Sequence, residues 1–187
     1  MPFPAQSDSM ARDTTKPMDR GALLEFIKRH RMAVQTSVST SGGPQAALVA
    51  FVMGDGFEIL FDTLETSRKV RNLRGNPRVA FVIGGWAPGD KRSVQYEGLA
   101  DEPNGADLDR LKRVYFGRVP GGDGPESWPD LTYVRVRPTW IRFGDFNQTP
   151  PVMVEFAADD ANGLMVPLQL NAGLGGGHQT CRSRLVK

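Results

Sequence analysis

The stretch FDTLETSRK, Phe61–Lys69, joins an apolar strand to a hydroxyl-rich turn and ends in two adjacent cations that open a short helix. The first backbone N–H groups of a helix lack partners within it and together carry about half a positive charge. Two threonines and a serine add hydroxyl donors at this helix start, and Arg68 and Lys69 add full positive charges. Charge-assisted hydrogen bonds of this kind are suited to a dianionic phosphate. We therefore predict an anion site where the strand gives way to the helix.

The residues that follow leave a second interpretation open. The chain has no acidic residue between Thr66 and Gly89, and five cations fall within eleven positions, at Arg68, Lys69, Arg71, Arg74 and Arg78. A short helix with a basic face in solvent, and with Thr66 as its N-cap, accounts for the same pattern. The spacing differs from that of a nucleotide P-loop, which requires G-x-x-x-x-G-K-[ST]. A phosphate bound here would therefore depend mainly on side chains.

The pattern around this stretch predicts an antiparallel barrel with peripheral helices. Most β-compatible segments follow one another through tight turns, without the regular helix alternation of a parallel sheet. We expect six or seven strands, at residues 32–39, 45–53, 57–61, 78–83, 93–101, 131–136 and 139–146. Three amphipathic helices are expected at residues 21–30, 67–74 and 106–116. The expected fold class is therefore mainly β.

The 187 residues suffice for one substantial core, which we place in a domain at residues 21–156. Residues 1–20 are expected to form a flexible leader, and residues 157–187 a Gly-rich tail. The leader lacks the apolar region of a secretory signal, and no apolar run reaches the roughly 18 residues of a membrane-spanning helix. Cys181 is the only cysteine, which fits a reducing compartment. We expect a cytoplasmic protein with no membrane partner.

Composition and the remaining polar residues argue against other kinds of site. The formal net charge of +2 is close to balance, and no aromatic residues alternate with the cations of the basic helix. Both features argue against a nucleic-acid partner. His178 and Cys181 are three positions apart in a Gly-rich segment, but two ligands do not make a zinc site. We therefore predict no metal site.

The run TLETSRK, Thr63–Lys69, resembles the T-x-x-x-S-R-K motif of the pyridoxamine 5′-phosphate oxidase-like flavoproteins, which bind FMN on a split β-barrel. The similarity continues in four further runs, the turn and strand from GPQ at 43–45 onward, NPR at 76–78, VQYEG at 94–98 and VRPTWIRF at 136–143. Together these runs extend the resemblance over about residues 21–146. The resemblance implies a six- to seven-stranded antiparallel split barrel of the FMN-binding type. It also implies a homodimer with FMN at the interface.

The resemblance further implies which residues contact the cofactor. They are Thr63, Ser67, Arg68 and Lys69 at the phosphate, Ala47, Leu48 and Val49 along the isoalloxazine ring, and Ser93, Gln95 and Trp140 around the ring or the ribityl chain. The strand around Leu48 would act largely through its backbone groups. Trp140 is equally compatible with a place in the barrel core. The sequence leaves open which subunit of a dimer would supply Gln95 and Trp140.

Two departures from the family pattern bear on the reaction. Val52 stands where the oxidases carry a lysine, and Arg142–Phe146 contains no R-L-H triplet. A substrate phosphate would lose its cationic partners, so we expect a cofactor pocket but little or no oxidation of pyridoxamine phosphate. The expected function is that of an FMN-dependent oxidoreductase acting on an unidentified small molecule, with no catalytic residue assigned. The alternatives are a reductase using the deazaflavin F420 on the same scaffold and a non-catalytic flavin- or haem-binding protein.

Overall fold

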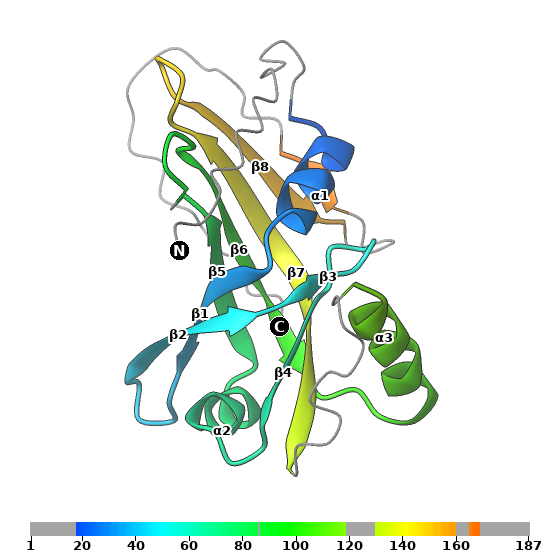
Figure 1. Cartoon of the computed structure of the whole chain (residues 1–187). Helices are drawn as coiled ribbons and strands as arrows, with labels where there is room; N and C mark the ends of the chain where they lie inside the picture. Colours follow the sequence, from blue (N-terminus) through cyan, green and yellow to red (C-terminus); the bar gives the residue numbers. More distant parts are fainter. Residues whose placement is uncertain (1–17, 86, 119–129, 160–164, 169–187) are drawn as a thin grey trace, which may run out of the picture.

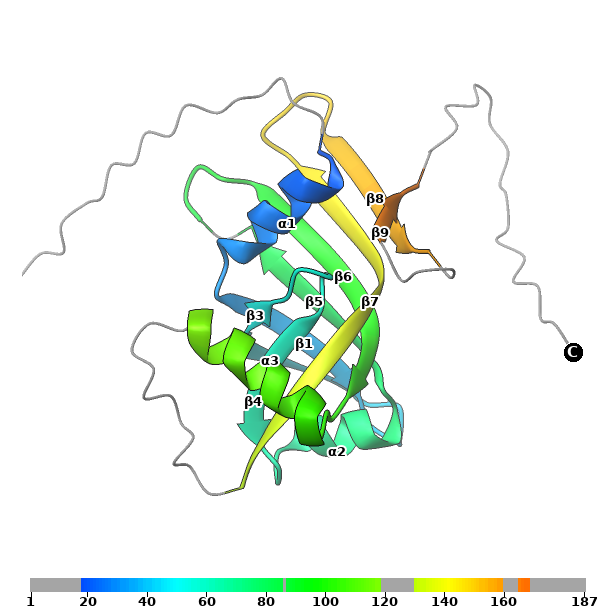
Figure 2. The same ribbon diagram turned by 90° about the vertical axis from the view of Figure 1, so that its right-hand side faces the viewer.

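The computed structural model describes residues 18–85, 87–118, 130–159 and 165–168. Within these residues three helices surround a nine-stranded antiparallel sheet that curls into an open barrel (Figures 1 and 2). The helices are α1 (Arg20–Lys28), α2 (Arg68–Gly75) and α3 (Gly105–Arg118). The strands are β1 (Met32–Val38), β2 (Pro44–Ala50), β3 (Val52–Met53), β4 (Ile59–Leu64), β5 (Arg78–Gly84), β6 (Arg92–Asp101), β7 (Leu131–Asp145), β8 (Val152–Ala158) and β9 (Met165–Pro167).

The sheet path runs β2-β1-β5-β6-β7-β4-β3, and β8 adds to β7 and carries β9 on its other edge. The two ends of this path, β2 and β3, are consecutive in the chain but do not pair with each other. The chain changes partner at Phe51, because β2 pairs with β1 whereas β3 pairs with β4. The barrel is therefore split on the side of β2 and β4.

The helices lie at different places on this barrel. Figures 1 and 2 show α1 and α2 at opposite ends and α3 on the side next to β4. The buried face of α2 consists of Val70, Asn72 and Leu73, which turn toward the barrel. The N-cap of α2 is Ser67, so the alternative that made Thr66 the cap is wrong. The helix therefore begins directly at the two cations, Arg68 and Lys69.

The core fills the barrel with apolar side chains from the inward face of each strand. Ile59 and Phe61 of β4 are fully buried and share this face at the two-residue spacing of a strand, and Phe57, which precedes β4, is fully buried in the same cluster. The Tyr96 hydroxyl lies 3.0 Å from the carbonyl oxygens of both Phe57 and Val136, which gives a buried polar group its partners. A second apolar cluster, which includes Val52, lies between β4, β7 and α3.

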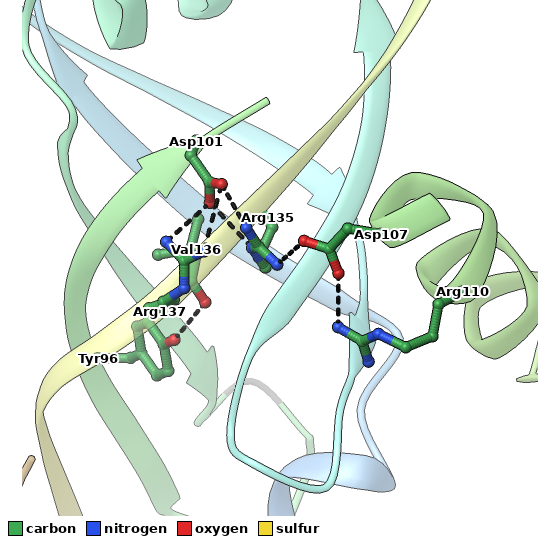
Figure 3. A network of polar contacts seen from close by, with 7 residues as sticks. All are labelled: Tyr96, Asp101, Asp107, Arg110, Arg135, Val136 and Arg137. Atoms are coloured by element: carbon green, nitrogen blue, oxygen red, sulfur yellow. Dashed lines mark hydrogen bonds and ion pairs between the residues drawn. The ribbon is translucent and has the colours of Figure 1, made fainter. Parts of the chain in front are cut away.

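A charged network fastens α3 to the sheet (Figure 3). Arg135 of β7 is buried, and its guanidinium donates to Asp101 of β6 and to Asp107 of α3. Asp107 also accepts from Arg110 at 2.9 Å, and Arg137 lies 3.4 Å from Asp101. The carboxylates satisfy the buried guanidinium, which would otherwise be costly to desolvate. The network thereby fixes α3 beside β4.

The structure confirms the mainly β class and the three helices, but it corrects several strands. The predicted strands 131–136 and 139–146 form one strand, β7, that passes through Pro138. Proline is tolerated there because it lies beside a bulge opposite Glu97 and Gly98. The predicted strand 45–53 is divided at Phe51, and β8 and β9 were not predicted. Strand β9 lies within the segment expected to be a tail, of which residues 169–187 lie outside the described part.

We predict that Gly98→Ala destabilises the fold. An added Cβ would meet the Arg137 carbonyl oxygen and would lie 2.6 Å from Val136 Cγ1, so β6 and β7 would have to separate. Overpacking against the backbone should lower the free energy of unfolding by about 2 kcal/mol or more. Denaturant unfolding followed by circular dichroism would measure the change. Gly117→Ala is the matched control, because no heavy atom lies within 4 Å of its added Cβ. An equal loss in both variants would contradict the packing argument.

Candidate anion and cofactor site

The junction between β4 and α2 brings three predicted residues together. Thr63 lies near the end of β4, and its hydroxyl is 3.4 Å from the hydroxyl of Ser67. Lys69 Nζ donates to Thr63 Oγ1 at 3.3 Å, and the Val70 N–H donates to Ser67 Oγ at 3.4 Å. We call Thr63, Ser67 and Lys69 the hydroxyl–lysine cluster. It consists of donors gathered at a helix N-terminus, which is the chemistry that a phosphate dianion requires.

The two cations of the motif differ in their surroundings. Arg68 is exposed, and in the described part of the chain its side chain has no hydrogen-bond or ion-pair partner. Lys69 is half-buried, and desolvation lowers the pKa of its ammonium group, while the charge of Asp62 opposes that shift. A desolvated cation gains more from a bound anion than an exposed one does. The pair therefore combines an exposed guanidinium with a partly desolvated ammonium group.

Two acidic residues border this cluster, and both are engaged elsewhere. Asp62 accepts a hydrogen bond from the Tyr115 hydroxyl of α3 at 3.0 Å. Glu65 lies 3.0 Å from Arg74, which also binds Glu102 through two bonds of 2.7 Å. Neither carboxylate forms an ion pair with Arg68 or Lys69 within the described residues. The cations of the site thus remain available to a ligand.

A group of buried and half-buried polar side chains on β1, β2 and α2 was not predicted as part of the site. Gln35 of β1 is buried opposite Ala47, and its Nε2 atom has no hydrogen-bond partner among the residues described. Asn72 of α2 donates to Ser37 and to Gln45, at 3.1 and 2.9 Å. A buried amide without an acceptor is uncommon and calls for a ligand or a water molecule. The donor set of the cluster and this unpaired amide both fit a phosphate-bearing cofactor with polar ring atoms.

The three residues predicted on β2 face different environments. Leu48 is 62% exposed on the outer face of the sheet, Val49 is buried, and Ala47 is half-buried. In the strand register Leu48 lies beside Val34 of β1, which in turn lies beside Val82 of β5. Only Ala47 and Val49 share the inward face with the buried amide of Gln35. The assignment of these residues to a flavin ring stays a prediction.

The structure does not join the other predicted residues to the hydroxyl–lysine cluster within one chain. Gln95 is exposed on β6 opposite Arg142 of β7, and Ser93 is half-buried opposite Gly144. Trp140 is half-buried and its indole Nε1 donates to Glu155 Oε2 at 3.4 Å. No hydrogen bond or ion pair among the described residues connects any of them to the cluster. Their role at a cofactor also stays a prediction.

Several residues of the site carried no usable sequence signal. Tyr115 and Asp62 are fifty-three positions apart, and Trp140 and Glu155 are fifteen apart. Glu155 lies on β8, which was not predicted, and it also lies 3.6 Å from Arg142. Only the tertiary fold places these pairs in contact. A spacing rule of the kind that identified the Thr63–Lys69 motif does not exist for them.

Other kinds of site find no support in the described part of the chain. No group of three or more metal-ligating side chains occurs there, and His178 and Cys181 lie outside it. No helix among the described residues is long and apolar enough to cross a membrane.

Comparison with protein families gives one family model that matches this chain. The family model described as pyridoxamine 5′-phosphate oxidase matches residues 20–144. The pyridoxine/pyridoxamine 5′-phosphate oxidase of Bordetella avium (strain 197N) is 28% identical over 142 residues, which make up 71% of this chain and 64% of that protein. The chain therefore spans less than two thirds of the length of this relative. The residues that the family model matches include the whole β4–α2 junction.

Solved structures of similar fold include proteins of more than one description. A pyridoxamine 5′-phosphate oxidase-related, FMN binding protein from Nostoc punctiforme PCC 73102 aligns with a TM-score of 0.62 and 13% identity, covering 82% of this chain and 98% of that one. A heme binding protein from Mycobacterium smegmatis aligns with a TM-score of 0.59 and 17% identity, covering 72% and 55%. At these identities the likeness establishes the split-barrel fold alone.

The fold and the family match lead to the same conclusion. The matched residues extend from the first residue of α1 nearly to the end of β7, which is more than half of the chain. They contain every strand of the path β2-β1-β5-β6-β7-β4-β3 and the cluster at the start of α2. This chain belongs to the pyridoxamine 5′-phosphate oxidase family.

Proposed function

We propose that this protein binds FMN and acts as an oxidoreductase on a small molecule. The observation that carries the proposal is the hydroxyl–lysine cluster at the N-terminus of α2, in a member of this family. Ser67 Oγ, Thr63 Oγ1, Lys69 Nζ and the unpaired guanidinium of Arg68 would hold the FMN phosphate. When bound, the flavin supplies hydride or electron transfer, and the protein supplies binding, orientation and electrostatic tuning.

The ring would lie along β2, in the split of the barrel. Within the described residues, strand β2 pairs with β1 alone along Ala47–Val49, because β2 is the end of the sheet path. The free edge of a strand offers N–H and C=O groups to a ligand. The unpaired Gln35 amide lies on the neighbouring strand β1, opposite Ala47, and offers a further donor. These groups suit the polar edge of an isoalloxazine ring.

We also propose that the active form is a homodimer. The outer face of β2, β1 and β5 exposes Leu48, Val38 and Val82, at 62%, 37% and 41%. Next to them a groove of about 470 Å³ carries Arg78 and Glu97, whose side chains have no hydrogen-bond or ion-pair partner among the described residues. Opposite charges on one apolar face suit a two-fold interface, because each copy then offers both partners. A second copy would also bring Gln95 or Trp140 toward the cluster.

Oxidation of pyridoxamine phosphate is not part of the proposal. Val52, which stands where the oxidases carry a lysine, is buried with Leu60 and Leu111 beneath α3. An apolar side chain packed in this way leaves no cation to bind a substrate phosphate. The substrate is therefore a different small molecule. Binding measurements with FMN and with the deazaflavin F420 would decide which of the two is the electron carrier.

A haem-binding function has less support within the described residues. Haem iron in proteins is most often held by histidine or another strong axial ligand. His30 is the only histidine in the described part of the chain, and its Nδ1 atom lies 2.9 Å from the Phe26 carbonyl oxygen. It follows α1, the helix that Figure 1 shows at the end of the barrel opposite α2. No observation at the cluster itself favours haem.

We predict that Arg68→Ala/Lys69→Ala weakens FMN binding by a hundredfold or more. Each charge-assisted hydrogen bond is worth about 1.5–3 kcal/mol, and two are removed. Quenching of flavin fluorescence would measure the dissociation constant. Riboflavin, which lacks the phosphate, should bind both proteins equally. Arg71→Ala is the matched control, because it removes one charge from the same helix at an exposed site beyond the cluster. FMN affinity that survives the double substitution would refute the assignment.

We predict that Val82→Arg converts the dimer to a monomer. The substitution places like charges opposite each other across a two-fold axis, in the middle of the exposed apolar face. Sedimentation equilibrium should show half the native mass, and FMN affinity should fall with it. Val166→Arg on β9 changes a residue of equal exposure away from this face and should leave the mass unaltered. A native protein that is already monomeric at micromolar concentration would contradict the dimer.

A further inference from the structure

Asp62 of β4 is the acidic residue next to Thr63, the residue that Lys69 contacts, and its charge acts on Lys69. Both side chains are half-buried, and the Asp62 carboxylate acts on the Lys69 ammonium through space. Asp62 follows Phe61 and precedes Thr63, the residue that Lys69 contacts at 3.3 Å. A carboxylate whose charge reaches a partly desolvated cation can compete with an anionic ligand for it. If the two paired, the cluster would lose its charge for an anion.

Strand β4 leaves room for that competition. It pairs with β3 only at Ile59 and Leu60, so beyond Leu60 its only strand partner in the described sheet is β7. Asp62 and Thr63 point to opposite faces, but they flank the same unpaired edge. A carboxylate on the outer face and a lysine near the inner face can therefore approach each other around this edge.

Tyr115 holds the carboxylate on the outer face. Its hydroxyl donates to Asp62 Oδ1 at 3.0 Å, and burial together with the nearby carboxylate raises the pKa of the phenol, which keeps the donor proton in place. The Tyr115 ring is itself fixed, because it packs edge-on against Tyr133 with centroids 5.9 Å apart. The contact of Arg135 with Asp107 fastens the same helix to the sheet (Figure 3). The donor is thus anchored to the sheet at two places.

We propose that Tyr115 is a positioning residue for the phosphate site, which acts by retaining Asp62 on the α3 side and so leaves Lys69 unpaired for the ligand. The proposal rests on the phosphate-binding role given to Lys69 above. It gives α3, which does not reach the cluster itself, a part in cofactor binding. Tyr115 is not a catalytic residue in this scheme, because it touches neither the cofactor nor a substrate.

The first test uses the cofactor-free protein, so that it does not depend on FMN. Isotope-labelled lysine followed by NMR reports the titration of Lys69, whose signal is identified by its absence in Lys69→Arg. Tyr115→Phe should raise the pKa of Lys69, because a released Asp62 would pair with it. In Tyr115→Phe/Asp62→Asn the increase should disappear. An unchanged Lys69 titration in Tyr115→Phe would overturn the proposal whether or not the protein binds FMN.

The second test measures the affinity for FMN. Tyr115→Phe should weaken binding by about tenfold to a hundredfold, the worth of one charge-assisted hydrogen bond. The double variant should recover the affinity of Asp62→Asn, and riboflavin should bind all variants alike. A loss of FMN affinity that Asp62→Asn does not rescue would mean that Tyr115 only supports the fold, and the proposal would be wrong. Failure of the native protein to bind FMN would instead refute the proposed function. The titration of Lys69 would still decide whether Tyr115 retains Asp62.

Discussion

The structure depends on one long strand that pairs with three others. Strand β7 lies beside β6 from Arg135 to its end, while its other edge takes β4 in its first half and β8 in its second. This change of partner is possible because Pro138 and the neighbouring bulge lie between the two halves. Because β4 is held by β7, the position of the β4–α2 junction follows from this pairing. The anion site therefore lies where the end of β4 is held by β7 alone.

The contacts made by the acidic residues near the site matter as much to its charge as the cations themselves. A basic helix start attracts nearby carboxylates as well as ligands, and either would neutralise it. Here Arg74 retains Glu65 and Tyr115 retains Asp62, so both acids that border the cluster have partners outside it. Among the described residues the Lys69 ammonium contacts only the Thr63 hydroxyl, and the Arg68 side chain has no hydrogen-bond or ion-pair partner. Such an arrangement keeps positive charge in place for a dianion at little cost to the fold.

Sequence patterns predicted the local features of the fold well. The periodic segments gave β1, β5 and β6 to within one residue at each end, and the β4–α2 motif gave both the family and the hydroxyl–lysine cluster. The errors concern places where local preference was overridden by partners. Pro138 suggested a strand end, but a bulge accommodates it, and the break at Phe51 arises because the chain changes strand partner. Strand β8 was missed because its residues continue into a segment with fading periodicity.

The sequence by itself determined the chemistry of the site, because hydroxyls, cations and a helix start that act together are consecutive at Thr63–Lys69. Short-range geometry brings such residues into contact in any fold that forms the strand and the helix. Only the tertiary structure decided which distant groups bear on that chemistry: Tyr115 at Asp62, the buried amide of Gln35 behind β2, and Glu155 beside Trp140. These contacts join residues far apart in the chain, and their geometry follows from strand register and helix docking, which no local spacing encodes.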